Sequence, residues 1–403
     1  MLLLGVVVGY ASCAGAQSAI APRKPLLGVV ERARNGSALL ARLDPRSLQP
    51  VSRKVEVGEY HRAWSLSPDA SHLALGVGGK GIGIKIVDLR TMRLARKIRT
   101  GIAAEALAWI GPRRLVAALQ RGGTVLVDPL SGRILRRWSG FSFPDASTPI
   151  RNGLVMLLPR LRKSSPGLPL IRVAGPPRLA VVEAPGRLRS VTLERIRLGV
   201  RVRAGVYYAD RAGLAVDFIR ARAYVLAADA PVATVDLRSM RVSYHRLEPL
   251  FLRPRSRLVA RERGAFALGS RYVVVFGRDF VSGRGRKEPG LAPAGAAVLK
   301  PADWSWRTLD RAATGATFAA NRVLAYGPGQ YPAAGIGVRA YLLGGRRVFS
   351  LFKGKRVFDV RLASGWAYVR TPKAVYVVDV ASGKVVREIV PPVDLVDVIV
   401  RRS

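Results

Sequence analysis

Acidic residues recur along the chain at one kind of position, where they could bind cations or shape the backbone. Each follows an apolar run and precedes a tight turn, as in KIVDLRT at Asp88 and VYVVDVASG at Asp379. The acids at this position are Asp44, Asp88, Asp128, Glu183, Asp236, Asp303 and Asp379. A ring of carboxylates would attract metal ions, whereas an Asp at a strand end accepts hydrogen bonds from nearby backbone N–H groups. Repetition at one local position favours the turn-forming role.

Other patterns with possible chemistry are weak in this chain. Residues 76–81 read GVGGKG, a GxGxxG match, but a dinucleotide site requires a helix after the glycines, and residues 82–87 form a strand-like run. His61 and His72 flank one expected hairpin without the third ligand that a zinc site needs. No GxSxG elbow supports a serine nucleophile. The sequence therefore predicts no catalytic residue, no metal site and no cofactor.

Basic residues far outnumber acidic ones. The chain has 67 Lys and Arg against 26 Asp and Glu, a formal net charge of +41. An excess of this size creates a positive field that attracts anionic polymers and opposes self-association, so a monomer is expected. Because the basic residues are spread along the chain without a basic helix or a continuous block, nucleic acid is not the expected partner.

Three long stretches interrupt the repeat, and two of them are strongly basic. They are residues 160–170, 277–295 and 327–337. Long loops in a compact domain are commonly functional, and a guanidinium binds carboxylate or phosphate through two hydrogen bonds. The candidate anion- or partner-binding residues are Arg160, Arg162, Lys163, Arg278, Arg284, Arg286 and Lys287. The alternative is that these side chains are solvated surface charge.

The acids belong to a hairpin that is repeated along the chain. An apolar strand, a tight turn and a second strand rich in Val, Ile and Arg occur eight times. Seven copies have the acid before the turn, and the copy at 340–352 lacks it and has Gly344 and Gly345 at its turn. A second hairpin precedes most copies, as at Ser67-Pro68-Asp69-Ala70, a favourable β-turn composition. A lone hairpin cannot bury its apolar face, so repeated hairpins indicate a β-propeller.

The repeats favour eight blades over seven, the lower number applying if one copy between residues 140 and 260 is not a full blade. The first blade has a strand at 26–30 with no innermost strand before it, while 393–400 is a strand left over at the other end. We expect the C-terminal strand to pair into the first blade, which would close the ring and remove an open edge. The three long stretches would then connect second and third strands and project from one face.

The N-terminus resembles an export signal. Residues 2–9 form an apolar segment too short to span a bilayer, and Ala14-Gly15-Ala16 fits a cleavage site. We therefore expect a signal peptide at 1–16, a linker at 17–25 and the propeller at 26–403. Alternatively the signal ends before Cys13, which would be lipidated and anchor the protein. No later stretch predicts a transmembrane helix.

The repeat resembles the YVTN/WD40-like repeats of bacterial β-propellers. The resemblance is carried best by residues 55–75, 85–101 and 374–390, where a strand, an Asp, a turn, a strand and a Gly accompany an SPDA hairpin. It implies seven or eight blades, export in many bacterial members and binding of a ligand or protein on one face, without a catalytic site. VDPLSGRILRRW is also similar to the repeat of quinoprotein dehydrogenases. However, Trp138 lies beyond the expected position and the other copies lack the tryptophan, so no quinone cofactor is expected.

Together these features predict an exported protein of the cell envelope or extracellular space. It would act as a scaffold that binds a protein or an anionic envelope polymer, and it is more readily a binding module than an enzyme. The alternative is a propeller hydrolase or lactonase with its site in the central funnel. An enzyme would place several titratable groups together at the mouth of the channel, whereas a binding module would show a broad basic or aromatic rim.

Overall fold

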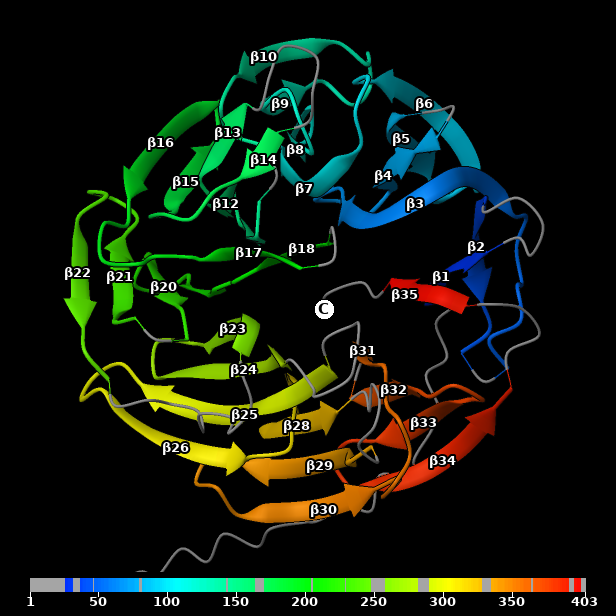
Figure 1. The fold of residues 1–403 in the computed structure, drawn as a ribbon. Helices are drawn as coiled ribbons and strands as arrows, with labels where there is room; N and C mark the ends of the chain where they lie inside the picture. The colour runs from blue at the N-terminus through cyan, green and yellow to red at the C-terminus, as the bar shows by residue number, and fades with distance from the viewer. Residues whose placement is uncertain are drawn as a thin grey trace, which may run out of the picture.

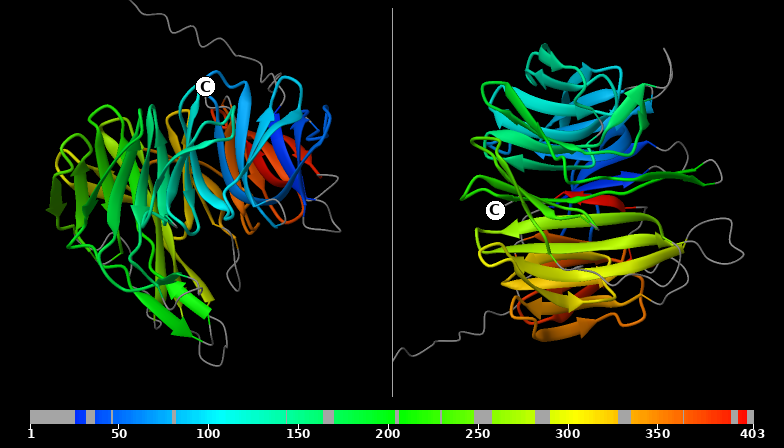
Figure 2. Two further views of the ribbon diagram at one scale, coloured as in Figure 1. Left: turned by 90° about the horizontal axis from the view of Figure 1, so that it is seen from above. Right: turned by 60° about the vertical axis from the view of Figure 1, so that its left-hand side comes forward.

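The computed structural model of the chain consists of antiparallel β-sheets arranged around a central axis (Figure 1). The structure describes residues 26–31, 37–45, 47–79, 82–142, 144–163, 170–203, 206–228, 230–247, 258–281, 290–327, 335–363, 365–390 and 395–399. No described residue lies in an α-helix. A helix able to cross a membrane is likewise not found among them. This arrangement confirms the predicted all-β propeller, whose sheets stand side by side when viewed from above (Figure 2).

Six sheets of four strands follow one another around the axis. Each runs from an innermost strand to an outermost strand at the rim (Figure 1). The first three consist of β7 (Ala104–Gly111), β8 (Arg114–Leu119), β9 (Thr124–Val127) and β10 (Ile134–Trp138); β11 (Ala146–Ile150), β12 (Gly153–Leu158), β15 (Arg178–Glu183) and β16 (Arg187–Thr192); and β19 (Gly213–Asp217), β20 (Arg222–Leu226), β21 (Val232–Asp236) and β22 (Val242–His245). The others consist of β23 (Leu258–Leu268), β24 (Tyr272–Val281), β25 (Gly290–Lys300) and β26 (Ser305–Asp310); β27 (Gly315–Ala319), β28 (Arg322–Gly327), β29 (Gly337–Leu342) and β30 (Arg347–Leu351); and β31 (Asp359–Ala363), β32 (Trp366–Arg370), β33 (Val375–Asp379) and β34 (Lys384–Ile389).

One seven-stranded sheet completes the ring and joins the two ends of the described chain. Its strands, in order, are β35 (Leu395–Ile399), β1 (Leu26–Glu31), β2 (Ala38–Leu43), β3 (Val55–Leu66), β4 (His72–Gly78), β5 (Gly83–Asp88) and β6 (Arg93–Arg99). β35 pairs antiparallel with β1, which confirms the predicted closure by the C-terminal strand.

β3 belongs to both halves of this sheet. Its first residues pair with β2, from Val55 to Gly58, and its later residues pair with β4, from Glu59 onward. The sheet is thus two overlapping four-stranded units, which is the arrangement that eight blades require. The blade number itself stays a prediction.

Two of the long stretches predicted as loops contain strand instead. β13 (Leu161–Lys163) and β14 (Leu170–Arg172) form a hairpin between β12 and β15, while the second stretch extends β24 and β25 beyond the length of most other strands. A further hairpin, β17 (Val200–Arg203) and β18 (Val206–Ala209), was not expected from the sequence. The repeat pattern did not reveal these strands because they lie outside the repeat.

Burial differs sharply between strands of one sheet. The middle strands β8, β9 and β12 are buried at almost every position, since neighbouring sheets cover both of their faces. The outermost strands β6, β10 and β34 are exposed at most positions. The core therefore lies between the blades, where residues such as Val125, Leu154 and Val181 are fully buried. This explains why the middle strands are continuous apolar runs.

Candidate functional site

The recurring acids form turns, as their position in the repeat predicts. The Asp88 carboxylate accepts hydrogen bonds from the backbone N–H groups of Arg90 at 2.7 Å and Thr91 at 3.1 Å. The same pattern occurs at Asp128 and Asp236. The hydrogen bond from Thr91 lowers the pKa of Asp88 most, because it stabilises the charged form. These carboxylates stabilise their turns, and that of Asp128 also forms an ion pair with Arg113 at 2.6 Å.

Glu183 departs from this pattern. Its carboxylate lies 2.6 Å from Arg189 Nη2, so it forms an ion pair across a hairpin. The longer Glu side chain reaches the neighbouring strand, where an Asp would reach its own turn. Metal ligands are also not gathered elsewhere: among the described ranges, no three His, Cys, Asp or Glu side chains converge as a metal site would require.

The predicted basic candidates have different surroundings. Arg160 and Arg162 are exposed beside and within β13, and Lys163 ends the same strand. Arg278 lies in β24, where its Nε donates to Glu262 Oε2 at 2.6 Å and its guanidinium lies 5.7 Å from the Phe280 ring. Arg278 therefore already has an anionic partner within the protein.

The remaining candidates, Arg284, Arg286 and Lys287, lie outside the described residues, as does Cys13. The structure consequently does not bring the whole predicted set together. Their role in binding stays a prediction.

The strand extension that carries Arg278 also contains a buried ion pair. Arg263 Nη1 lies 2.7 Å from Asp279 Oδ1, and the two side chains are only 3% and 2% exposed. The same Arg263 nitrogen donates to the carbonyl oxygens of Glu262 and Arg278. The bond to the Arg278 carbonyl crosses from β23 to β24, as the ion pair itself does. This pair therefore fixes β23 against β24.

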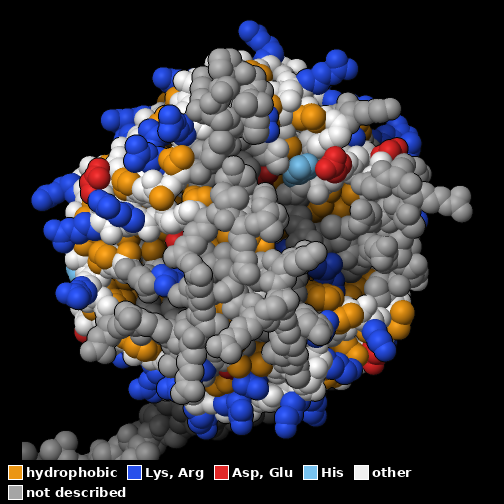
Figure 3. Space-filling model, viewed as in Figure 1, with side chains coloured by type: hydrophobic (Ala, Val, Ile, Leu, Met, Phe, Trp, Pro, Cys, Tyr) orange, Lys and Arg blue, Asp and Glu red, His pale blue; other side chains and the backbone are white. Residues whose placement is uncertain are grey.

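Exposed basic side chains are concentrated on the outermost strands. Figure 3 shows Lys and Arg gathered around the circumference of the propeller. We call these residues the basic rim; they are Arg93, Arg96, Lys97, Arg99, Arg133, Arg136, Arg137, Arg187, Arg241, Arg307, Arg347, Lys384 and Arg387. Their position was missed by sequence reasoning that looked only at loops. The Arg-rich second strand of each repeated hairpin was the signal available.

Some arginines also connect neighbouring blades. Arg96 Nε donates to the carbonyl of Leu130 at 3.1 Å, and Arg136 Nη1 donates to that of Gly186 at 3.2 Å. Arg189 bonds the carbonyl of Leu237 at 2.8 Å in the same way. In each case the acceptor lies in the turn between the third and fourth strands of the next blade. A long side chain with several N–H donors can bond such a carbonyl across the gap between blades. Part of the arginine excess therefore has a structural role.

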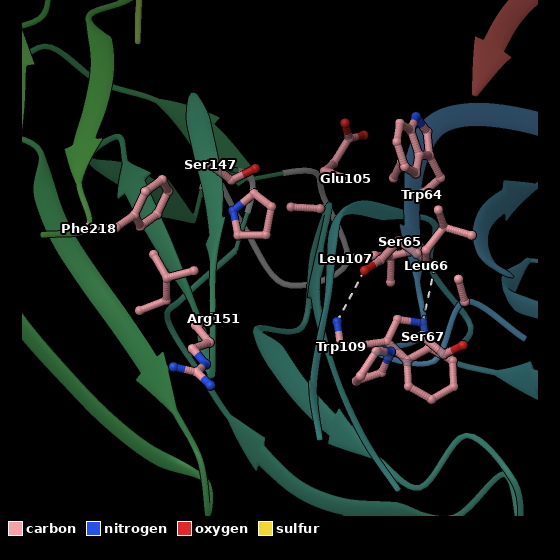
Figure 4. A pocket seen from close by; sticks show the side chains of 16 residues that line it. Trp64, Ser65, Leu66, Ser67, Glu105, Leu107, Trp109, Ser147, Arg151 and Phe218 are labelled. Carbon is pink, nitrogen blue, oxygen red and sulfur yellow. Dashed lines mark hydrogen bonds between the residues drawn. The ribbon is translucent and has the colours of Figure 1, made fainter. Parts of the chain in front are cut away.

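A cavity of about 750 Å³ lies among the innermost strands β3, β7 and β11. Trp64, Leu107 and Ile150 contribute apolar surface to it, and Phe218 approaches from the turn after β19. Figure 4 shows Glu105 and Arg151 in separate parts of this cavity.

The charges of the cavity do not form a catalytic pair. Gln120 Nε2 donates to the Glu105 carboxylate at 2.5 Å, and Arg151 belongs to the turn between β11 and β12. Trp109 is fixed deeper in the wall, because its Nε1 donates to the Ser65 carbonyl at 3.1 Å. The arrangement can hold an apolar group near separate positive and negative charges.

Comparison with known proteins identifies the fold but not a family. No family model matches the chain, and no curated protein is similar to it in sequence. Similar solved structures are β-propellers. The dihydro-heme d1 dehydrogenase NirN in complex with DHE has a TM-score of 0.60 and 14% identity over 93% of this chain and 74% of its own.

Two other similar structures are of comparable length to this chain. Apo AztD from Citrobacter koseri has a TM-score of 0.54 and 12% identity, over 93% of this chain and 96% of that one. BamB from Moraxella catarrhalis has a TM-score of 0.50 and 10% identity, over 87% of this chain and 90% of that one. These likenesses support a propeller scaffold. The YVTN/WD40-like assignment stays a resemblance.

Proposed function

We propose that this protein is an exported, non-enzymatic scaffold of the cell envelope or extracellular space, acting as a monomer that binds an anionic polymer. The observation that carries the proposal is the basic rim, in which exposed Lys and Arg side chains surround the propeller (Figure 3). Over the whole chain, basic residues outnumber acidic ones by 67 to 26, so the net charge of the protein is strongly positive. A polymer with repeated carboxylate or phosphate groups can contact several blades at once.

The acidic residues strengthen this interpretation. Asp88 and Asp236 accept hydrogen bonds from backbone N–H groups of their own turns, and Asp128 also forms an ion pair with Arg113, which lies outside the rim, at 2.6 Å. Glu262 and Asp279, in contrast, neutralise Arg278 and Arg263 within one blade. The rim is therefore a part of the described surface where many basic side chains face solvent.

The experiment is binding of the full chain to polyphosphate and to polyglutamate at several salt concentrations. We expect binding that weakens steeply as salt rises, because exposed charges are screened. Changing Arg93, Lys97 and Arg99 of β6 to Ser should weaken it, and changing Arg284, Arg286 and Lys287 to Ser tests the predicted loop separately. Binding that is insensitive to both sets and to salt would contradict the proposal. Binding of a neutral protein partner alone would favour a protein scaffold instead.

Export rests on the N-terminal segment, which lies outside the described residues. Fusing residues 1–25 to a reporter that is active only outside the cytoplasm should give activity. Cys13→Ser would then distinguish the two signals, because only a lipid-anchored protein would be released from the membrane by this change. A reporter that stays inactive would contradict export.

A further inference from the structure

The turn between β19 and β20 exposes two large apolar side chains. Phe218 is 58% exposed and Ile219 is 72% exposed. The corresponding turn between β3 and β4 contains Ser67, Pro68 and Asp69 instead. Exposing an aromatic and a branched side chain at adjacent positions forgoes the burial that normally stabilises such groups. The fold itself gives no reason for an apolar pair here.

The backbone of this turn is held in place. Asp217 is only 1% exposed, and its Oδ1 accepts hydrogen bonds from the N–H groups of Ile219 at 2.9 Å and Arg220 at 3.1 Å. Arg220 Nη1 donates to the carbonyl of Ser270 in the next blade at 3.2 Å. A partner that binds a fixed turn does not have to order it first, which favours affinity.

Phe218 continues the apolar wall of the cavity among β3, β7 and β11. The cavity opens beside Ser67 and Pro68 of the β3–β4 turn and Arg151 of the β11–β12 turn, on the same face as Phe218. Figure 4 shows Phe218 opposite the strand that carries Trp64. A volume of about 750 Å³ is within the range of about 300–1,000 Å³ usual for ligand pockets and can hold large side chains.

The charge around this opening is mainly positive. Arg151 lines the cavity and is exposed, Arg220 follows the apolar pair, and Arg271 is exposed in the adjacent turn after β23. Two acids also lie here: Glu105 in the wall, which is hydrogen-bonded by Gln120, and the exposed Asp69 of the β3–β4 turn. A complementary ligand therefore combines large apolar groups with negative charge.

We propose that this face binds an acidic peptide segment of a partner protein, with an aromatic or large aliphatic side chain entering the cavity against Phe218 and neighbouring acids facing Arg151 and Arg220. The surface is distinct from the basic rim in both position and chemistry, because a polymer without apolar groups would gain nothing from Phe218 and Ile219. Exposed apolar anchors surrounded by charge are typical of protein interfaces.

The test uses fluorescein-labelled peptides and the full chain at physiological salt. One peptide alternates Phe with Asp, a second replaces each Phe with Ser, and a third replaces each Asp with Lys. The Phe–Asp peptide should bind at least about tenfold more tightly than the Ser–Asp peptide, since an apolar anchor adds to charge attraction. The Phe–Lys peptide should not bind. Equal affinity of the Phe–Asp and Ser–Asp peptides for the unmodified protein would overturn the proposal.

Variants then locate the site. Phe218→Ser with Ile219→Ser should weaken binding of the Phe–Asp peptide by about tenfold or more and leave the affinity for the Ser–Asp peptide unchanged. The matched control is Ile134→Ser with Leu135→Ser on β10, which removes an exposed apolar pair from the rim and should change binding less than about twofold. Arg151→Gln should weaken binding more than Arg93→Gln does. Equal losses in the two apolar double variants would refute the assignment of the site.

Discussion

The outermost and innermost strands use arginine in opposite ways. On the outermost strands, Arg96 and Arg136 are exposed, and each donates to a carbonyl of the next blade. On the innermost strand β23, Arg263 is 3% exposed and pairs with Asp279. Arginine is thus a solvated charge at the rim and a buried, ion-paired charge on an innermost strand.

This difference shows how depth decides what a charge contributes. A rim arginine is surrounded by water, so its removal changes folding little, although many together create a field that acts on partners. If a buried arginine loses its acidic partner, no water is present to solvate the remaining charge. We therefore expect folding to depend on individual inner charges, and binding to depend on the sum of outer ones.

Asp279→Asn would test the inner part of the comparison with the largest expected effect. Arg263 would keep its charge at 3% exposure without a carboxylate, and breaking a buried pair costs about 3–5 kcal/mol. Urea denaturation should show this loss in the free energy of unfolding.

A double change separates the charge from the packing. Arg263→Met with Asp279→Leu removes both buried charges, and such replacements are often neutral or stabilising. We expect the double variant to be more stable than Asp279→Asn. If Asp279→Asn unfolds like the unmodified protein, the pair does not fix β23 against β24.

Trp109→Phe should have the next largest effect, again near the axis. The indole N–H donates to the Ser65 carbonyl at 3.1 Å, and Trp109 as a whole is 6% exposed. Losing a buried hydrogen-bond donor leaves its acceptor unpaired, which costs about 1–3 kcal/mol. Ser65→Ala is the companion change, because the Ser65 hydroxyl accepts from the Trp109 backbone N–H at 3.1 Å. Unchanged unfolding midpoints in both would show that water replaces these bonds.

Much of the fold was predictable because the repeat encodes local structure. Asp88 and Asp379 mark turns through short-range hydrogen bonds, and the spare apolar run near the C-terminus indicated closure. The connections between blades were not predictable, since the acceptor of Arg136 is 50 residues away in the chain. The cavity among β3, β7 and β11 was not predicted for the same reason, because Trp64, Arg151 and Phe218 come from separate blades.

On the outer strands, single changes should have small effects. Arg136→Met removes the bond to the Gly186 carbonyl, and we expect a loss of about 0.5 kcal/mol, as for most surface substitutions. Arg93→Met is the control, because no described bond joins Arg93 to the next blade. If Arg136→Met is as costly as Asp279→Asn, rim and interior do not differ as we infer. If Arg93→Met lowers stability as much as Arg136→Met does, the bond from Arg136 to Gly186 does not stabilise the contact between blades.

The smallest effect is expected at Asp69, an exposed acid in the turn that leads out of an inner strand. Hydrogen bonds from the Ser67 hydroxyl, then from Ser71, lower the pKa of Asp69 to about 2. Because the pKa is lower in the folded protein than in the unfolded chain, these bonds stabilise the fold above the unfolded value of about 4. The stabilisation should decline as the pH falls below about 4 and disappear only below the folded pKa of about 2. Asp69→Asn should therefore lower stability slightly at neutral pH and not at about pH 1, measured by thermal unfolding across this range. Ser71→Ala should reproduce part of the change. A difference between Asp69→Asn and the unmodified protein that persists at about pH 1 would assign the effect to the shape of the turn instead of to its charge.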